Sequence, residues 1–496
     1  MYYKSTRNSS IRFSAAEAIV NGISAEGGLF VPSEIPQMTL DEITALGNMT
    51  YSERAAAVFS KYLTDFTAEE IRYCTDNAYT DKSFATKNIA EVKKLTDDIH
   101  ILELWHGPTC AFKDMALQIL PYLLTTSVKK INLNKNVVIL VATSGDTGKA
   151  ALEGFADVPG TNIIVFYPED GVSAMQKRQM TTQDGANVKV CALKGNFDDC
   201  QNGVKAIFTD ENVKKKLSDA GMMFSSANSI NWGRLAPQII YYLSSYAELV
   251  KNGSIKAGEK INITVPTGNF GNILAAYYAK NMGMPVNKLI CASNANNVLT
   301  DFINTGVYDR NRSFITTISP SMDILISSNL ERLLYLLSGE DDAVIRDLFG
   351  KLASTGRYEV SADVKAKLQA DFCAGCCDDR QTMAEISDIY KKYSYTLDTH
   401  SAVAVKVYED YRARTGDTTK TLIASTASPY KFSASVLEAI EGKRSDDDEY
   451  TLIDRLNKLS GYPIPASLAA LKDKSARFTD VIGRDDMEEY VLKSLS

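Results

Sequence analysis

Residues 137–155 read VVILVATSGDTGKAALEGF: a run of β-branched and aliphatic residues, a glycine-rich turn and then a helix-forming segment. The same order of strand, loop and helix occurs in residues 261–279, INITVPTGNFGNILAAYYA, and again in residues 419–440. Strands that alternate with helices in this way predict βαβ units and a mainly parallel sheet. Because such units occur on both sides of residue 200, we predict an α/β fold with two open domains and a cleft between them.

The rest of the chain differs in texture from these α/β segments. Apolar residues at helical spacing predict a mostly helical region at the N-terminus, and a more helical stretch interrupts the second α/β segment. We therefore predict four regions: 1–98 (mostly helical), 99–245 (α/β), 246–444 (α/β with a helical insertion around 310–397) and 445–496 (a closing segment).

Composition excludes several classes of protein. The 496 residues are 45% hydrophobic and 23% charged, with a formal net charge of -7, so no basic surface for nucleic acid or anionic membrane is expected. The first ten residues, MYYKSTRNSS, lack the apolar core of a signal peptide. No apolar run approaches the roughly 20 residues that span a bilayer. We expect a soluble cytoplasmic protein with no nucleic-acid or membrane partner.

The numbers and spacing of cysteines and histidines limit the kinds of catalytic and metal site that the chain can form. In an intracellular chain the eight cysteines are expected to be reduced. The CAGCC cluster at 373–377 lacks a second Cys/His pair at zinc-site spacing, so we predict no metal site. Only three histidines exist, His100, His106 and His400. Acid–base chemistry must therefore fall mostly to lysine, acidic residues or a cofactor.

The loop in the opening stretch, TSGDTG at 143–148, has the features of an anion site. Gly145 and Gly148 allow a tight turn, and the N–H groups at the start of the following helix would face an anion placed there. Thr143, Ser144 and Thr147 add hydroxyl groups. A tight strand-to-helix turn without a ligand explains the same residues equally well.

A second loop, PTGNFGN at 266–272, follows the same logic. Two glycines bracket Asn269 and Phe270, and Asn272 opens the helix, so backbone amides and Asn side chains can cradle a phosphate. The loop is neither a Walker motif nor GxGxxG, so neither ATP nor NAD is its natural occupant.

Lys113 lies beside Asp114 in HGPTCAFKD, residues 106–114. On this segment alone, a solvated lysine at a helix start is the plainer interpretation. Two anion loops beside a lysine instead suggest pyridoxal phosphate, whose aldehyde needs a lysine amine and whose phosphate needs a helix start. The cofactor's ring nitrogen needs a partner as well, and TASP at 426–429 offers Thr426 and Ser428.

At this point nearly the whole chain resembles the threonine synthase family of pyridoxal-phosphate enzymes, which has the tryptophan synthase β-like fold (PLP fold-type II). The matching segments, in family order, are YKSTRN (3–8), EGGLFVPSEIP (26–36), LWHGPTCAFKDMALQIL (104–120), SGDTG (144–148), NSINWGRLAPQIIYY (228–242), PTGNFGN (266–272), DTHSAVA (398–404) and STASPYKF (425–432). The chain departs from the usual family pattern at Asn8, Cys110, Lys149, Thr399 and Ser428.

The resemblance implies a role for each site residue. Lys113 is expected to be the Schiff-base lysine, Thr426 to face the pyridine nitrogen and His400 to line the site. The expected ligands of the cofactor phosphate are Gly268, Asn269, Phe270, Gly271 and Asn272. The expected substrate-binding residues are Thr143, Ser144, Asp146, Thr147, Asn231 and Arg234, with Arg234 on the substrate phosphate. The division between the two loops follows from the resemblance, since their chemistry allows either order.

The activity that the resemblance implies is conversion of O-phospho-L-homoserine and water to L-threonine and phosphate, the last step of threonine biosynthesis. This is a γ-elimination followed by β-addition of water. Two alternatives stay open: a dehydratase-like lyase acting on serine or threonine, and a non-catalytic protein that binds a phosphate ligand. We expect a monomer or a homodimer.

Overall fold

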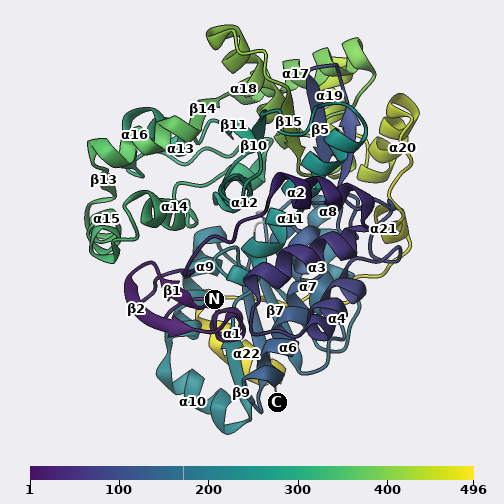
Figure 1. Cartoon of the computed structure of the whole chain (residues 1–496). Helices are drawn as coiled ribbons and strands as arrows, with labels where there is room; N and C mark the ends of the chain where they lie inside the picture. Colours follow the sequence, from purple (N-terminus) through teal and green to yellow (C-terminus); the bar gives the residue numbers. More distant parts are fainter. Residues whose placement is uncertain (144, 171, 496) are drawn as a thin grey trace.

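The computed structural model describes residues 1–143, 145–170 and 172–495, and two large sheets dominate it (Figure 1). The six-stranded sheet has the order β14 (Phe372–Cys376), β11 (Val286–Ser293), β10 (Ile261–Pro266), β15 (Thr421–Ser425), β5 (Ile99–Glu103) and β4 (Glu91–Lys94). The five-stranded sheet has the order β16 (Val481–Ile482), β8 (Val188–Leu193), β7 (Thr161–Pro168), β6 (Asn136–Ala142) and β9 (Met222–Ser225). Neighbouring strands are parallel throughout, except that β4 is antiparallel to β5.

Helices cover both faces of each sheet, as a parallel sheet requires. Along β6, Val137, Ile139 and Val141 belong to the main core, whereas Val138 and Leu140 pack into a second cluster on the opposite face. This alternation follows from the two-residue period of a strand. The β-branched run that opens the sequence analysis is therefore buried on both sides, and its continuous apolar character has this cause.

The connecting helices follow the predicted alternation with strands. Between β5 and β11 they are α5 (Asp114–Leu117), α6 (Leu120–Lys130), α7 (Asp146–Phe155), α8 (Ala174–Thr181), α9 (Phe197–Thr209), α10 (Glu211–Asp219), α11 (Trp232–Lys251) and α12 (Gly271–Asn281). Helix α10 and the C-terminus lie at the end of the molecule farthest from α17 (Asp379–Tyr393), and α22 (Met487–Leu495) packs against α9 (Figure 1).

The insertion and the C-terminal part are largely helical. Their remaining elements are α13 (Val298–Thr305), β12 (Val307–Asp309), α14 (Leu330–Leu337), α15 (Asp342–Thr355), β13 (Arg357–Glu359), α16 (Ala362–Asp371), α18 (Thr399–Thr415), α19 (Ser433–Glu441), α20 (Glu449–Ser460) and α21 (Ala466–Ala469). The CAGCC segment forms β14 and the residue after it, so these cysteines lie at the edge of the six-stranded sheet.

The N-terminal region is mostly helical, as predicted, but begins with a small antiparallel sheet. It contains β1 (Tyr3–Ser5), β2 (Asn8–Phe13), α1 (Ala15–Asn21), β3 (Phe30–Pro32), α2 (Leu40–Ala45), α3 (Tyr51–Tyr62) and α4 (Ala68–Ala78). Each of the four helices starts with a capping box, in which a Ser or Thr and a Glu three residues later satisfy the free backbone N–H groups.

Helix α11 joins these parts. It is buried on nearly every side, as expected of a helix that is apolar all round. Its Trp232 packs against three tyrosine rings, Tyr3 and Tyr62 of the N-terminal region and Tyr278 of α12, at centroid distances of 5.4–5.5 Å. The N-terminal region, α11 and both sheets consequently share one continuous apolar core.

The sheets cross the regions that we predicted from sequence texture. Strand β5, from the segment 99–245, lies in the six-stranded sheet beside β15, and β16, from the closing segment, pairs with β8. Strand β5 leads directly into the Lys113 segment. This segment therefore lies at the carboxyl ends of the parallel strands β5, β15 and β10. The region boundaries themselves stay a prediction.

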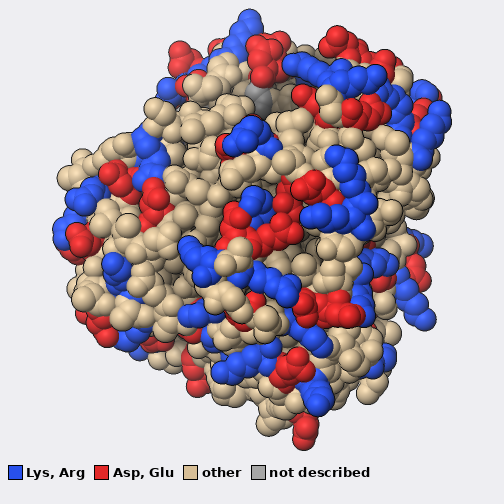
Figure 2. All heavy atoms as spheres, turned by 90° about the horizontal axis from the view of Figure 1, so that it is seen from above, with Lys and Arg blue, Asp and Glu red and all other residues tan. Residues whose placement is uncertain are grey.

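Acidic and basic side chains are interspersed on the face shown in Figure 2, in keeping with the balanced composition. Ion pairs of the protein include Lys406 with Asp410 and Arg455 with Glu441. Within the described residues, no helix is both long enough and apolar enough to cross a membrane.

Candidate functional site

Lys113 lies directly before helix α5, where its segment pairs with the end of β15. The Phe112 N–H donates to the Thr426 carbonyl (2.8 Å) and the Ser428 N–H donates to the Cys110 carbonyl (3.0 Å). Two motifs more than 300 residues apart in sequence are thus held side by side, and Lys113 is placed next to Thr426.

Asp114 shapes the turn in front of the lysine. Its carboxylate accepts hydrogen bonds from the Thr109 N–H (2.8 Å) and the Thr109 hydroxyl (2.6 Å). A Cβ at Gly107 would lie 2.5 Å from the Asp114 side chain, so glycine is needed at that position. The acidic residue beside Lys113 therefore holds the Gly-Pro turn.

The Lys113 amine has polar neighbours in a buried setting. Its Nζ donates to the Ser321 hydroxyl (3.2 Å), lies 3.7 Å from Asp146 Oδ2 and lies 5.0 Å from the centre of the Phe112 ring. Burial lowers the pKa of Lys113, and the charges of Lys431 and Arg234 lower it further against the opposing effect of Asp146. A buried lysine with a lowered pKa is a ready nucleophile and base.

The SGDTG loop begins helix α7 without a side-chain cap. The Thr143 hydroxyl accepts hydrogen bonds from the N–H groups of Gly145 and Gly148 (2.9 Å each), so it holds the turn together. Thr147 is half-buried, and its hydroxyl has no hydrogen-bond partner in the part of the chain that the structure describes. Ser144 lies outside the described residues.

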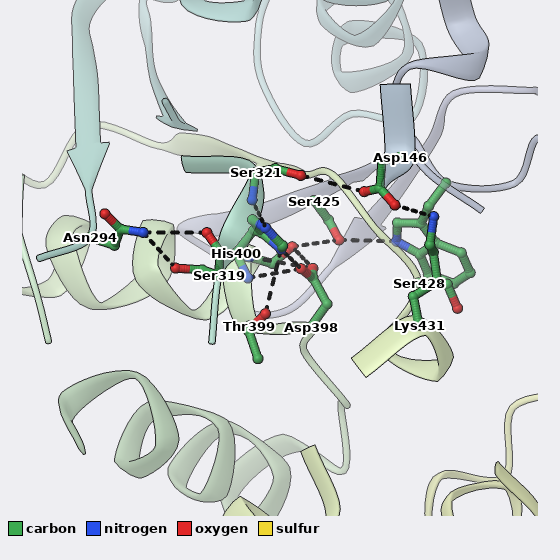
Figure 3. Close-up of polar contacts among 12 residues, drawn as sticks. Asp146, Asn294, Ser319, Ser321, Asp398, Thr399, His400, Ser425, Ser428 and Lys431 are labelled. Atoms are coloured by element: carbon green, nitrogen blue, oxygen red, sulfur yellow. Dashed lines mark hydrogen bonds and ion pairs between the residues drawn. The ribbon is translucent and has the colours of Figure 1, made fainter. Parts of the chain in front are cut away.

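Asp146 is the carboxylate on which this part of the site converges (Figure 3). Lys431 Nζ lies 2.5 Å from Oδ1, Gln176 donates to Oδ1 (3.1 Å) and Ser321 donates to Oδ2 (3.4 Å). Burial would raise the pKa of Asp146, but the charges of Lys431 and Lys113 and these hydrogen bonds together hold it well below its usual range. Asp146 is therefore a buried anion.

The GNFGN loop turns into helix α12 through Phe270, whose φ of 62° is left-handed, and α12 also has no side-chain cap. A Cβ at Gly268 would lie 2.8 Å from the Ser321 carbonyl oxygen, so the backbone approaches too closely for any other residue. Asn272 accepts hydrogen bonds from the hydroxyls of Tyr241 and Tyr242, but its buried Nδ2 donor is unpaired among the described residues. Asn269 is exposed.

Arg234 and Asn231 begin helix α11 and use their side chains differently. The Asn231 side-chain amide donates to the carbonyls of Ile19 and Ser226 and accepts a hydrogen bond from the Gly233 N–H. These bonds fix the NSIN segment to α1. Arg234 is 4% exposed and donates to the Ala227 carbonyl, while its Nε lacks a partner within the described chain. Burial lowers the pKa of Arg234 to about 10. A buried, partly unpaired guanidinium near Lys113 is suited to an anionic ligand.

His400 contacts Ser321 (Figure 3), whose hydroxyl accepts a hydrogen bond from Lys113. Its Nε2 accepts a hydrogen bond from the Ser321 N–H (3.1 Å), and its Nδ1 lies 3.0 Å from Asp398 Oδ1. The Nε2 contact requires an unprotonated nitrogen there, so the proton sits on Nδ1 toward Asp398. His400 thus orients the loop that carries the hydroxyl acceptor of Lys113.

Three family models match the chain in order. "Threonine synthase N terminus" covers residues 2–79, "Pyridoxal-phosphate dependent enzyme" covers 87–347 and "Threonine synthase, C-terminal" covers 401–491. Threonine synthase of Saccharomyces cerevisiae is 36% identical over 490 residues, covering 92% of this chain and 93% of its own length. The chain belongs to the threonine synthase family.

Further relatives agree with this membership. Human threonine synthase-like 1 is 41% identical over 90% of the chain, and the chain spans 61% of that protein's length. A PLP-bound threonine synthase from Brucella melitensis has a TM-score of 0.88 at 35% identity, covering 100% of this chain and 99% of that one. The yeast structure gives 0.89 at 32%, covering 100% and 98%. The predicted fold class is confirmed, and the family's cofactor is pyridoxal phosphate.

The residues around Lys113 fit that cofactor. The unpaired Asn272 donor and the uncapped start of α12 offer hydrogen bonds to its phosphate. The Thr426 side chain is buried, and its hydroxyl has no hydrogen-bond partner among the residues described, so it can serve the ring nitrogen. Lys113 would supply the amine. A buried donor without a partner, such as Asn272 Nδ2, is costly unless a ligand satisfies it.

Three residues of this site were missed in the sequence analysis: Ser321, Gln176 and Lys431. Ser321 and Gln176 lie in segments without a diagnostic motif, so no local signal marks them. Lys431 stands in STASPYKF, where a second lysine inside a site motif was the available signal. It is 2% exposed, which is rare for a lysine unless it is paired.

Proposed function

We propose that the chain is a threonine synthase that converts O-phospho-L-homoserine and water to L-threonine and phosphate. The observation that carries this proposal is Arg234, a buried guanidinium with an unpaired Nε close enough to Lys113 to lower the pKa of that lysine. The cofactor phosphate and the substrate carboxylate account for the two loops. A third anion site is needed only if the substrate carries a phosphate of its own.

Each residue receives one task in this proposal. Backbone N–H groups of GNFGN and Asn272 would hold the cofactor phosphate, and the Thr426 hydroxyl would face the ring nitrogen. Thr147 and the start of α7 would bind the substrate carboxylate, and Arg234 would bind the substrate phosphate. When bound, pyridoxal phosphate supplies a conjugated system that stabilises negative charge on the substrate carbons.

Lys113 would act as the general base and general acid. Its lowered pKa favours the neutral amine, which can take a proton from the substrate Cα and return protons to neighbouring carbons. The Ser321 hydroxyl holds the amine in place, and His400 holds the Ser321 backbone. Neither acidic residue of the Lys113 and SGDTG motifs is free for this task, because Asp114 is bonded to Thr109 and Asp146 to Lys431.

The decisive measurement is phosphate release from O-phosphohomoserine, with threonine identified as the product. Serine and threonine serve as comparison substrates, with 2-oxo acid formation as the readout. Arg234→Gln should raise the KM for O-phosphohomoserine by about tenfold or more, which corresponds to the loss of one charge-assisted hydrogen bond.

The two alternatives give different results in this assay. A serine or threonine dehydratase would form a 2-oxo acid without needing Arg234. A non-catalytic protein would release neither product. Either outcome would contradict the proposal. A cytoplasmic location and a monomeric or homodimeric state are also predictions of the sequence, and size measurement in solution tests the second.

A further inference from the structure

Three charged groups meet in the site, and their signs do not balance. Lys113 and Lys431 bring two ammonium groups to the single carboxylate of Asp146. The side chain of Lys113 is 11% exposed, that of Lys431 0% and that of Asp146 4%, so water screens these charges little. The two lysines therefore compete for one carboxylate, and one of them must form the weaker ion pair with Asp146.

The N–O distances show which lysine forms the stronger ion pair with Asp146. Lys431 Nζ lies 2.5 Å from Asp146 Oδ1, whereas Lys113 Nζ lies 3.7 Å from Oδ2. Lys431 also donates to the Thr109 carbonyl (3.1 Å), inside the turn that Asp114 holds. Gln176 and Ser321 also donate hydrogen bonds to the Asp146 carboxylate. Asp146 is thus committed to Lys431, and the nearest acceptor of Lys113 is a neutral hydroxyl.

We propose that Lys431 is a positioning residue, which occupies the Asp146 carboxylate and thereby leaves the Lys113 amine free to attach the cofactor. The inference rests on the proposed function, because it requires Lys113 to be the attachment lysine. Attachment joins the neutral Lys113 nitrogen to the aldehyde carbon with the loss of one water, so a lysine held as an ammonium by a carboxylate would react slowly.

Among the described residues, the charged groups with the largest effect on the pKa of Lys113 act in the direction that the proposal requires. They are Asp146 on α7, Lys431 on the short 3₁₀ helix Pro429–Phe432 and Arg234 on α11. Burial and the two cations lower the pKa of Lys113, and of these three charged groups Asp146 raises it. His400, on α18, reaches the lysine only through Ser321. Removing Lys431 would free Asp146 to pair fully with Lys113.

The test measures attachment at Lys113 without relying on turnover. The full-length protein is incubated with pyridoxal phosphate over a pH series and reduced with borohydride, and the labelled Lys113 peptide is quantified by mass spectrometry. The midpoint of labelling against pH is compared between the parent, Lys431→Met, Lys431→Arg, Asp146→Asn and the double variant of Lys431→Met with Asp146→Asn.

The expected shifts have defined signs. Lys431→Met should raise the labelling midpoint by roughly one to two pH units, the usual effect of an unshared opposite charge at this distance. Lys431→Arg should keep most of the parent behaviour. Asp146→Asn should lower the midpoint, and adding it to Lys431→Met should abolish the rise. A merely structural role of Lys431 would not produce a rise that depends on Asp146.

Lys149→Met is the matched control. Lys149 is also a buried lysine of the same region, but it pairs with Glu153 and Gln183. Its replacement should leave the Lys113 midpoint unchanged. An unshifted midpoint in Lys431→Met, with label on Lys113, overturns the inference and leaves the proposed function standing.

Two further outcomes are also decisive. If Lys431→Met does not fold, Asp146→Asn carries the test, and a midpoint that is unchanged or raised in that variant overturns the inference. If the parent carries its label on another lysine, the attachment role of Lys113 fails and this inference falls with it.

Discussion

At the scale of single residues, two aspartates of the site show how surroundings decide charge. Asp114 is buried among hydrogen-bond donors, and burial raises its pKa to about 6. Asp146 is equally buried, yet two lysine ammonium groups hold its pKa below the usual range. The same chemical group is therefore prone to protonation in one place and a firm anion in the other. The nearest cation, at 2.5 Å for Asp146, makes the difference.

Asp114 should make the stability of the protein depend on pH. Its folded-state pKa of about 6 lies above the value near 3.9 in an unfolded chain, so the folded state binds more protons between these values. The stabilisation is complete below about pH 4 and is lost as the pH rises through about 6. Relative to Asp114→Asn, the parent's free energy of unfolding should fall by about 2 kcal/mol over this window. Urea unfolding at several pH values measures it, and a constant difference contradicts the prediction.

At the scale of elements, the helices that follow the two glycine-rich loops begin differently from the helices of the N-terminal region. Helices α1 to α4, away from the site, all start with a Ser or Thr capping box. Helices α7 and α12 start at the two glycine-rich loops and have no side-chain cap. A capped helix start has already satisfied its N–H groups, whereas an uncapped one can offer them to an anion. Helices α6, α13, α14 and α19 also start without a side-chain cap, so the case for a ligand at the two loops rests on the uncapped starts together with the tight glycine turns.

The close backbone approach at Gly268 predicts a defect that is confined to cofactor binding. In Gly268→Ala the new Cβ would meet the Ser321 carbonyl at 2.8 Å, so the loop must shift away from its present position. Cofactor affinity should fall about tenfold or more, as for a loss near 1.4 kcal/mol. Equilibrium dialysis with absorbance detection measures this.

Gly350→Ala is the control for Gly268→Ala. Gly350 lies inside helix α15, where a Cβ would meet nothing within 4 Å, so this variant should bind cofactor normally and be slightly more stable. If Gly268→Ala retains cofactor as well as the parent does, the GNFGN loop is not the phosphate site.

At the scale of the whole molecule, the N-terminal family motif acts as a clamp. The Thr6 hydroxyl donates to Glu331 (2.6 Å), and Arg7 binds the same carboxylate through two nitrogens (2.9 and 2.7 Å). The next residue of α14, Arg332, donates to the carbonyls of Phe30 and Ile230. The first strands, the NSIN segment and the insertion are thereby fastened together.

Breaking this clamp should lower the stability of the folded protein. Glu331 is 3% exposed, so Glu331→Ala leaves Arg7 and Thr6 without their partner and should lower the free energy of unfolding by about 2–4 kcal/mol. Asp347→Ala removes an exposed ion pair with Lys351 in the neighbouring helix and should cost less than about 1 kcal/mol. Equal effects of the two variants in urea unfolding would contradict the clamp.

Local sequence determined the features that need only neighbouring residues. The α/β class, the two glycine-rich loops and the lysine behind its Gly-Pro turn each depend on a short pattern, because strand period, turn geometry and helix starts are set within a few residues. The family resemblance then assigned roles to these segments. The helical character of the N-terminal region followed in the same way.

Tertiary structure alone decided which side chains meet. Lys431 and Asp146 are 285 residues apart, and Ser321 and His400 are 79 apart, so no local pattern can pair them. The bridge between residues 110–112 and 426–428 likewise depends on β5 entering the six-stranded sheet beside β15. Burial is the physical reason: it brings distant charges into a setting of weak screening, where contacts of a few ångströms determine which lysine is an ion-pair partner and which is a free amine.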